Sequence, residues 1–220
     1  MKIEAVLFDM DGTIIKSLSM WNELIASFVG QENIETFRKL RNKTDGKGLA
    51  RDCQVLQTVF NIEHTNKEIE QLYHSRAKEI FSRTPVEFVD GFVGFHKHLT
   101  SKNIRLSLVT NAPNYGLNIL KAKLNLPFFF GSHIYNSCMM NYKFKPDPIM
   151  LLHALEKLEV DKENCVIFED SLDGIIAAKR AKIRCIAIND GNNSHEISEA
   201  DFIINNYVGL TLEKINSLFS

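Results

Sequence analysis

The sequence predicts an α/β fold: a doubly wound, Rossmann-like parallel sheet with an inserted helical domain. After residue 85, short apolar runs alternate with segments of helical periodicity, which is typical of a parallel sheet. Residues 17–84 show helical spacing and no strand signal. At 220 residues the chain is long enough for one sizeable core and a smaller second domain. We therefore expect residues 1–16 and 85–220 to form the sheet domain and residues 17–84 a four-helix insertion.

The first predicted strand, residues 3–7, ends in Asp9 and Asp11 and is bounded by Gly12. Its apolar composition suits the centre of a parallel sheet, where ligands bind beyond the carboxyl ends of the strands. Two carboxylates two residues apart point roughly the same way and need either a cation or a retained proton. Mg²⁺ would suit them, with one acid attacking phosphorus and the other transferring protons. An ordinary polar turn after a strand is the alternative.

The insertion follows this turn directly. Apolar residues recur there at steps of three and four, beginning with Trp21, Leu24 and Phe28, and Gly30, Gly46 and Asn61 punctuate the pattern. The remaining elements are expected as strands at residues 104–109, 133–135, 165–168, 185–188 and 202–204, and as helices at residues 92–99, 115–124, 149–158, 175–181 and 210–218.

Composition and charge limit the function classes. A net charge of −1 gives no general attraction to nucleic acid or to a membrane surface. The first apolar run contains Glu4 and stops at Asp9, so it is neither a signal peptide nor a membrane span. The four cysteines are widely spaced, which indicates reduced core thiols rather than zinc ligands or disulfides. We expect a cytoplasmic protein, a monomer or a weak dimer, that binds neither nucleic acid nor membrane.

Polar groups follow three of the predicted strands. They are Asp9 with Asp11, Thr110 with Asn111, and Glu169 with Asp170. If these strands are neighbours in a parallel sheet, the groups meet at one edge. The four acids would then supply enough oxygens for an octahedral Mg²⁺ that keeps some of its waters.

Such an acidic site needs compensating charge, which Lys145 could supply from just before a predicted helix. The Thr110 hydroxyl and the Asn111 backbone N–H could bind a further oxygen. Each residue also has a structural alternative. Thr110 could cap a helix, Lys145 could be a solvated surface lysine, and Glu169 with Asp170 could cap the helix that follows them.

Four segments of the chain together carry a family pattern. They are Asp9-Met10-Asp11-Gly12-Thr13, Thr110-Asn111, Lys145-Pro146, and Glu169-Asp170-Ser171 with Gly174-Ile175. In this order and spacing the chain resembles the haloacid dehalogenase-like hydrolase superfamily. It is similar to the subfamily I branch with a helical C1 cap, which holds β-phosphoglucomutase, phosphoglycolate phosphatase and sugar-phosphate phosphatases. The resemblance implies a catalytic core of residues 1–16 and 85–220 with a cap of residues 17–84.

The resemblance implies a Mg²⁺-dependent phosphatase that acts on a small phosphorylated metabolite similar to a sugar phosphate. Asp9 would be the nucleophile that becomes an aspartyl-phosphate, and Asp11 the acid and base. Mg²⁺ would be held by the Asp9 side chain, the Asp11 backbone carbonyl and Asp170, with Glu169 bound directly or through water. The phosphoryl group would be held by Thr110, Asn111 and Lys145. A phosphomutase of the β-phosphoglucomutase type, or a catalytically silent binding module, are the alternatives.

The insertion carries a run of basic residues, and cap loops of relatives close over the site. Lys43, Lys47 or Arg51 would therefore contact an anionic or hydroxylated substrate, and the alternative is a solvated helical face. Lys16 departs from the family pattern, because relatives usually carry an acid shortly after the Gly-Thr turn. Any family rule about that acid does not transfer to this chain.

Overall fold

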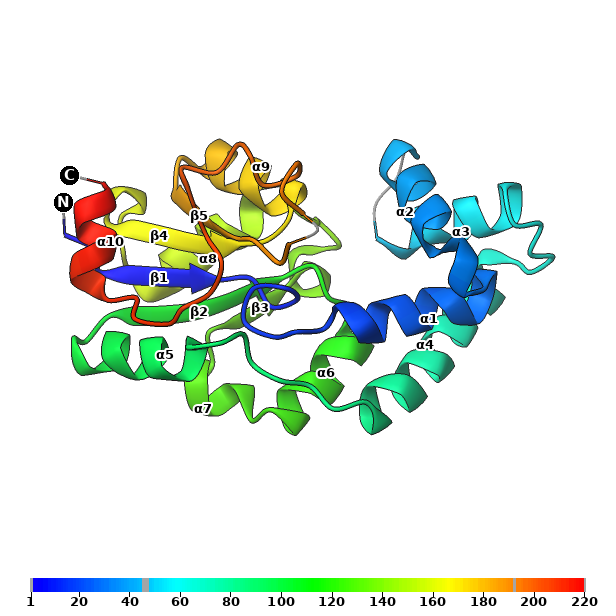
Figure 1. Cartoon of the computed structure of the whole chain (residues 1–220), viewed down its shortest axis with the longest axis horizontal. Helices are drawn as coiled ribbons and strands as arrows, with labels where there is room; N and C mark the ends of the chain where they lie inside the picture. The colour runs from blue at the N-terminus through cyan, green and yellow to red at the C-terminus, as the bar shows by residue number, and fades with distance from the viewer. Residues whose placement is uncertain (1, 45–47, 192, 220) are drawn as a thin grey trace. The chain divides into compact units, whose positions relative to one another are not determined.

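The computed structural model of the chain describes residues 2–44, 48–191 and 193–219 (Figure 1). It divides into two compact units. The first, here the sheet unit, contains Met1–Lys16, Val86–Pro113 and Leu124–Ser220. The second, the helical unit, contains Ser17–Pro85 and Asn114–Lys123. That these units act as a catalytic core and a cap stays a prediction.

The sheet has six parallel strands in the order β3-β2-β1-β4-β5-β6, which confirms the predicted fold class. The strands are β1 Ala5–Phe8, β2 Arg105–Thr110, β3 Ile134–Asn136, β4 Cys165–Glu169, β5 Arg184–Ile188 and β6 Phe202–Ile204. The central strand β1 lies between β2 and β4, so Phe8 stands opposite both Leu108 and Phe168. The polar ends of these three strands therefore lie side by side.

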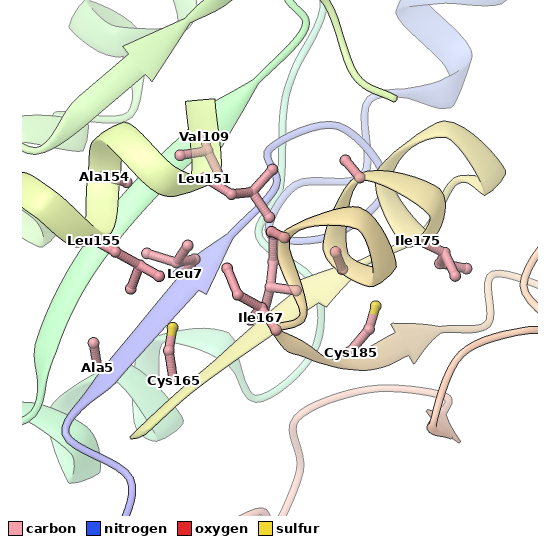
Figure 2. Close-up of a cluster of buried hydrophobic side chains, with 14 of the residues drawn as sticks. Ala5, Leu7, Val109, Leu151, Ala154, Leu155, Cys165, Ile167, Ile175 and Cys185 are labelled. Carbon is pink, nitrogen blue, oxygen red and sulfur yellow. The ribbon is translucent and has the colours of Figure 1, made fainter. Parts of the chain in front are cut away.

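One face of the sheet is covered by α8 (Ile149–Leu158) and α9 (Leu172–Ala181) and is aliphatic (Figure 2). Its buried side chains include Ala5, Leu7, Val109, Leu151, Ala154, Leu155, Cys165, Ile167, Ile175 and Cys185. Because side chains alternate along a strand, the neighbours of these strand residues point to the opposite face. Burial on both faces explains why the sequence of β1 is a continuous apolar run.

The opposite face of the sheet is aromatic. The rings of Phe8 and Phe168 stack with their centroids 5.3 Å apart. Phe92 and Phe95 of α5 (Phe92–Ser101) pack edge-on against Phe8. The remaining helices of the sheet unit are α7 Leu126–Phe130 and α10 Leu212–Leu218. Large rings on this face bury more apolar area per residue than the aliphatic side chains of the other face.

The helical unit contains the four helices expected between residues 17 and 84. They are α1 Leu18–Val29, α2 Ile34–Lys43, α3 Leu49–Thr58 and α4 Asn66–Arg83. It also contains α6 (Asn114–Lys123), which the sequence had grouped with the sheet domain. The Lys123 ammonium donates to the Phe81 carbonyl of α4 at 3.0 Å, and the Phe81 ring packs on Gly116. No helix among the described residues is long and apolar enough to cross a membrane.

The chain leaves the sheet unit and returns to it as a short antiparallel pair. Ile15 bridges Phe88, and the Lys16 amide donates to the Glu87 carbonyl at 2.9 Å. The Lys16 ammonium lies 2.7 Å from an Asp90 carboxylate oxygen, and this hydrogen bond raises the pKa of Lys16. Lys16 therefore pairs with an acid on the returning segment, which accounts for a basic residue at this position.

Candidate active site

The end of β1 leads into a turn that closes on itself. The Gly12 amide donates to the Ile15 carbonyl at 2.9 Å, and the Ile14 amide donates to the Met10 carbonyl at 3.0 Å. Gly12 has φ +76°, and a Cβ atom there would lie 2.0 Å from an Asp170 carboxylate oxygen. Glycine is required at this position both for its left-handed backbone and for the close approach of Asp170. The turn thus holds Asp9 and Asp11 against the end of β4.

Lys145 lies at the centre of the site and is almost completely buried. Its ammonium donates to Asp9 Oδ1 at 2.7 Å, to the Val109 carbonyl at 2.8 Å and to Glu169 Oε1. Burial alone would lower the pKa of Lys145, but the charges of Asp9 and Glu169 outweigh it and raise that pKa. Lys145 is therefore a charged, fully bonded cation and not a solvated surface lysine.

Asn111 holds the backbone of Lys145 in place. The Lys145 amide donates to Asn111 Oδ1 at 2.9 Å, and Asn111 Nδ2 donates to the Lys145 carbonyl at 3.3 Å. The side chain of Asn111 thus acts as a bracket between the end of β2 and the segment before α8. The Thr110 hydroxyl accepts a hydrogen bond from the Ala112 amide at 3.0 Å, so its proton can still be donated to a ligand oxygen. Their contact with a phosphoryl group stays a prediction.

Glu169 is completely buried at the end of β4. Besides Lys145, its carboxylate accepts a hydrogen bond from the Ser171 hydroxyl at 3.2 Å. A Cβ atom at Gly174 would lie 1.9 Å from the Glu169 carboxyl carbon, so the first turn of α9 is shaped around this side chain. Burial raises the pKa of Glu169, with Lys145 opposing the rise and Asp9 adding to it. Because the Glu169 oxygens already accept hydrogen bonds from Lys145 and Ser171, Glu169 is a weaker candidate for a direct metal ligand than Asp9 or Asp170.

A divalent cation fits the acidic cluster. Oxygens of Asp9, Glu169 and Asp170 lie within 4.8 Å of one another. Burial raises the pKa of Asp170, and the negative charges of Asp9, Glu169 and Asp11 raise it further. One lysine does not neutralise these carboxylates, and oxygen ligands are those that Mg²⁺ prefers. The residues present therefore suit Mg²⁺, whereas a ligand from the Asp11 backbone stays a prediction.

The described geometry thus brings four distant segments together beyond the carboxyl ends of β1, β2 and β4. A family model for haloacid dehalogenase-like hydrolases matches residues 3–182. The chain belongs to the haloacid dehalogenase-like hydrolases. The resemblance drawn from the motifs is confirmed, and the chain is an enzyme, a phosphatase-type hydrolase of this family.

Relatives of this hydrolase are named for reactions of phosphorylated compounds. A phosphorylated carbohydrates phosphatase of Thermotoga maritima is 30% identical over 198 residues, which cover 86% of this chain and 88% of that protein. A beta-phosphoglucomutase of Bacillus subtilis is 25% identical over 223 residues, covering 97% of this chain and 94% of the relative. The crystal structure of CbbY from Rhodobacter sphaeroides with phosphate aligns with a TM-score of 0.82. The alignment covers 97% of this chain and 99% of the CbbY chain, with 24% sequence identity, and at this identity it supports the fold alone.

The basic residues expected to contact substrate belong to the helical unit of this hydrolase. Lys47 and the side chain of Lys43 lie outside the described residues. Arg51 lies on α3 beside Asp52, and burial raises the pKa of Asp52 while Arg41 and Arg51 lower it. Contact of these basic side chains with a substrate stays a prediction.

Two residues that the motifs do not contain also reach the site, and both lie after the segment matched by the family model. Asn193 Nδ2 donates to the Asp170 carbonyl at 2.8 Å and to the Ile188 carbonyl at 3.0 Å. The Tyr207 hydroxyl donates to the Thr13 carbonyl at 3.1 Å. Nothing in the local pattern around either residue indicates these partners, because they lie 23 and 194 positions away in the chain.

Proposed function

We propose that this enzyme is a Mg²⁺-dependent phosphatase of small phosphorylated carbohydrate-like metabolites, acting through an aspartyl-phosphate on Asp9. The observation that carries the proposal is the contact of Lys145 with Asp9 inside a cluster of buried carboxylates. The names of the relatives support the substrate class, since one of them is a phosphatase of phosphorylated carbohydrates.

The chemistry follows from the contacts of Asp9. Lys145 holds Oδ1, which leaves Oδ2 as the atom that attacks phosphorus. A bond then forms between Oδ2 and phosphorus, and the bond from phosphorus to the leaving oxygen breaks. Asp11 gives that oxygen its proton. Asp11 then removes a proton from water, which attacks the phosphorus and releases phosphate from Asp9.

Mg²⁺ would be held by Asp9 and Asp170, with Glu169 behind them, and when bound it supplies positive charge to the phosphoryl oxygens. The Thr110 hydroxyl would bind those oxygens from the β2 side, and the positive charge of Lys145 would attract them while its three N–H donors stay on Asp9, Val109 and Glu169. In this arrangement Glu169 serves mainly to keep Lys145 charged and in place.

The test is phosphate release from a panel of phosphorylated sugars and small acids by the full chain in Mg²⁺. The Asp9→Asn variant should lose at least about three orders of magnitude in kcat, because it lacks the nucleophile. Asp161→Asn is the matched control, since Asp161 is exposed and precedes β4 at the other end of the sheet. No release from any member of the panel would refute the proposal.

A phosphomutase is the second candidate, favoured by the beta-phosphoglucomutase relative. It predicts that phosphate remains organic and that phosphorylated Asp9 persists long enough for mass spectrometry. Rapid appearance of free phosphate would exclude it. A catalytically silent binding module would be indicated if the Asp9→Asn variant lost no function relative to the wild type.

A further inference from the structure

Tyr207 is almost completely buried in the segment between β6 and α10. Its ring belongs to the aromatic face of the sheet, with centroids 5.2 Å from Phe168 and 5.5 Å from Phe95. Packing accounts for the ring but not for the hydroxyl, because a buried hydroxyl is costly unless it is hydrogen-bonded. A phenylalanine would fill the same space.

The hydroxyl is bonded to the turn that carries the two aspartates. It donates to the carbonyl of Thr13, which is completely buried, at 3.1 Å. On the other side of that residue, the Thr13 hydroxyl lies 3.4 Å from Asp170 Oδ1. Tyr207 therefore binds the turn near its C-terminal end, whereas Asp9 lies at its N-terminal end. The bonded residue, Thr13, directly follows Gly12, which is in close contact with Asp170.

The backbone of Tyr207 is itself held firmly. Its amide donates to the Asp90 carbonyl at 2.9 Å. Gly91 has φ +80°, and a Cβ atom there would lie 2.4 Å from the Val208 amide nitrogen. Two segments of the sheet unit are thus in close contact at this point, and the phenol extends from a fixed base.

We propose that Tyr207 is a positioning residue whose hydroxyl fixes the Thr13 carbonyl, and thereby the turn that presents Asp9 and Asp11 to the phosphoryl group. The inference rests on the proposed phosphatase function. Burial raises the pKa of Tyr207, and the charges of Asp9, Asp170 and Glu169 raise it further, so the phenol keeps the proton that it donates.

The experiment compares the wild-type chain with Tyr207→Phe and Tyr135→Phe. Tyr135 is the matched control because it is a buried tyrosine on β3 whose hydroxyl bonds to His133 Nδ1 at 3.2 Å. In Tyr207→Phe we expect kcat to fall about tenfold with KM changed less than about twofold, because the substrate-binding groups stay in place. In Tyr135→Phe both constants should stay within about twofold of the wild type.

Amide hydrogen exchange supplies a readout that does not depend on activity. The turn amides of Gly12, Ile14 and Ile15 should exchange about tenfold faster in Tyr207→Phe, while amides of the central strands keep their rates. Wild-type exchange rates in the turn would overturn the inference, and so would a wild-type kcat in an active enzyme. Uniformly faster exchange throughout the sheet would also overturn it, since that indicates a purely structural role.

The failure of this inference is distinguishable from the failure of the proposed function. If the wild-type chain releases no phosphate, the phosphatase proposal fails, whereas the exchange rates of Tyr207→Phe still decide whether the hydroxyl fixes the turn. If the wild-type chain is active and the variant behaves like it, only the inference about Tyr207 is overturned.

Discussion

Replacing Lys145 by methionine removes a buried cation that is bonded to both Asp9 and Glu169. Methionine keeps most of the length and apolar volume of the side chain, so the main change is the loss of charge and hydrogen bonds. The ammonium makes three contacts, with Asp9, Glu169 and the Val109 carbonyl. Each acceptor is at least nine-tenths buried or belongs to the backbone of a buried strand.

The magnitude follows from the buried charges that remain. Breaking a buried ion pair by removing one partner costs about 3–5 kcal/mol, because the other charge is left without compensation. The free energy of unfolding of a typical domain is about 5–15 kcal/mol, so the variant loses a large share of it. Activity should fall by at least about two orders of magnitude, since Asp9 loses its bound cation and the phosphoryl oxygens lose a nearby positive charge.

The variant should regain stability as the pH falls. Burial already raises the pKa of Glu169, and Lys145 is a charge that lowers it, so its removal raises this pKa further. The folded variant then binds more protons than the unfolded chain, and its free energy of unfolding decreases as pH rises through the raised pKa. Between pH 7.5 and pH 5.5 one such proton restores up to about 2.7 kcal/mol.

Urea unfolding in chelator at the two pH values measures this difference. Lys143→Met is the matched control, because Lys143 is exposed two residues earlier and its loss should change stability by less than about 0.5 kcal/mol. Adding Glu169→Gln to Lys145→Met should recover stability at pH 7.5 but not activity. The reasoning is refuted if Lys145→Met is as stable as the wild type, or if it loses further stability relative to the wild type on acidification.

The other predictions concern packing, pH and metal. Gly174→Ala should destabilise the fold by about 1–3 kcal/mol in urea unfolding, because its Cβ would collide with the Glu169 carboxyl carbon, 1.9 Å away. Gly94→Ala is its control and should stabilise α5 by about 0.5–1 kcal/mol, because among the described residues a Cβ there would meet nothing within 4 Å beyond its chain neighbours and the backbone of the helix. Equal effects at both glycines would contradict the contact between Gly174 and Glu169. Burial lowers the pKa of His96 from 6.5, against the opposing hydrogen bond to the Phe129 carbonyl, so the unfolded chain binds the extra proton. The free energy of unfolding should therefore fall by up to about 1.4 kcal/mol per pH unit below pH 6.5. His96→Gln should reduce this pH dependence, and an unchanged pH dependence in the variant would contradict the assignment to His96. EDTA should abolish phosphate release and Mg²⁺ should restore it, whereas activity indifferent to chelation would contradict the metal site.

Much of the sheet unit was predictable because its determinants are local. The apolar runs at β1, β2 and β4 are short, and each ends in polar residues, so both the strands and their polar ends are visible in the sequence. The assignment of α6 was not predictable in the same way. Its apolar periodicity predicts a helix correctly, but the partner of the helix depends on Phe81, a residue 35 positions away from Gly116.

The sequence alone determined the candidate groups of the site. Asp9 and Asp11 follow a central strand, and the four family motifs predict the chemistry before any contact is known. Hydrophobic periodicity and strand ends are properties of neighbouring residues, so a linear pattern contains them. This is also why the fold class and the family could be predicted from it.

Only the tertiary structure decided which polar group bonds to which. Asn111 is hydrogen-bonded to the backbone of Lys145, and the Glu169 carboxylate accepts hydrogen bonds from Lys145 and Ser171. The Tyr207 hydroxyl binds the carbonyl of Thr13, which is 194 residues away in the chain. A buried donor must find an acceptor, but the chain can supply that acceptor from any segment that folding brings near. The identity of the partner is therefore a property of the packed molecule and leaves no periodic trace in the sequence.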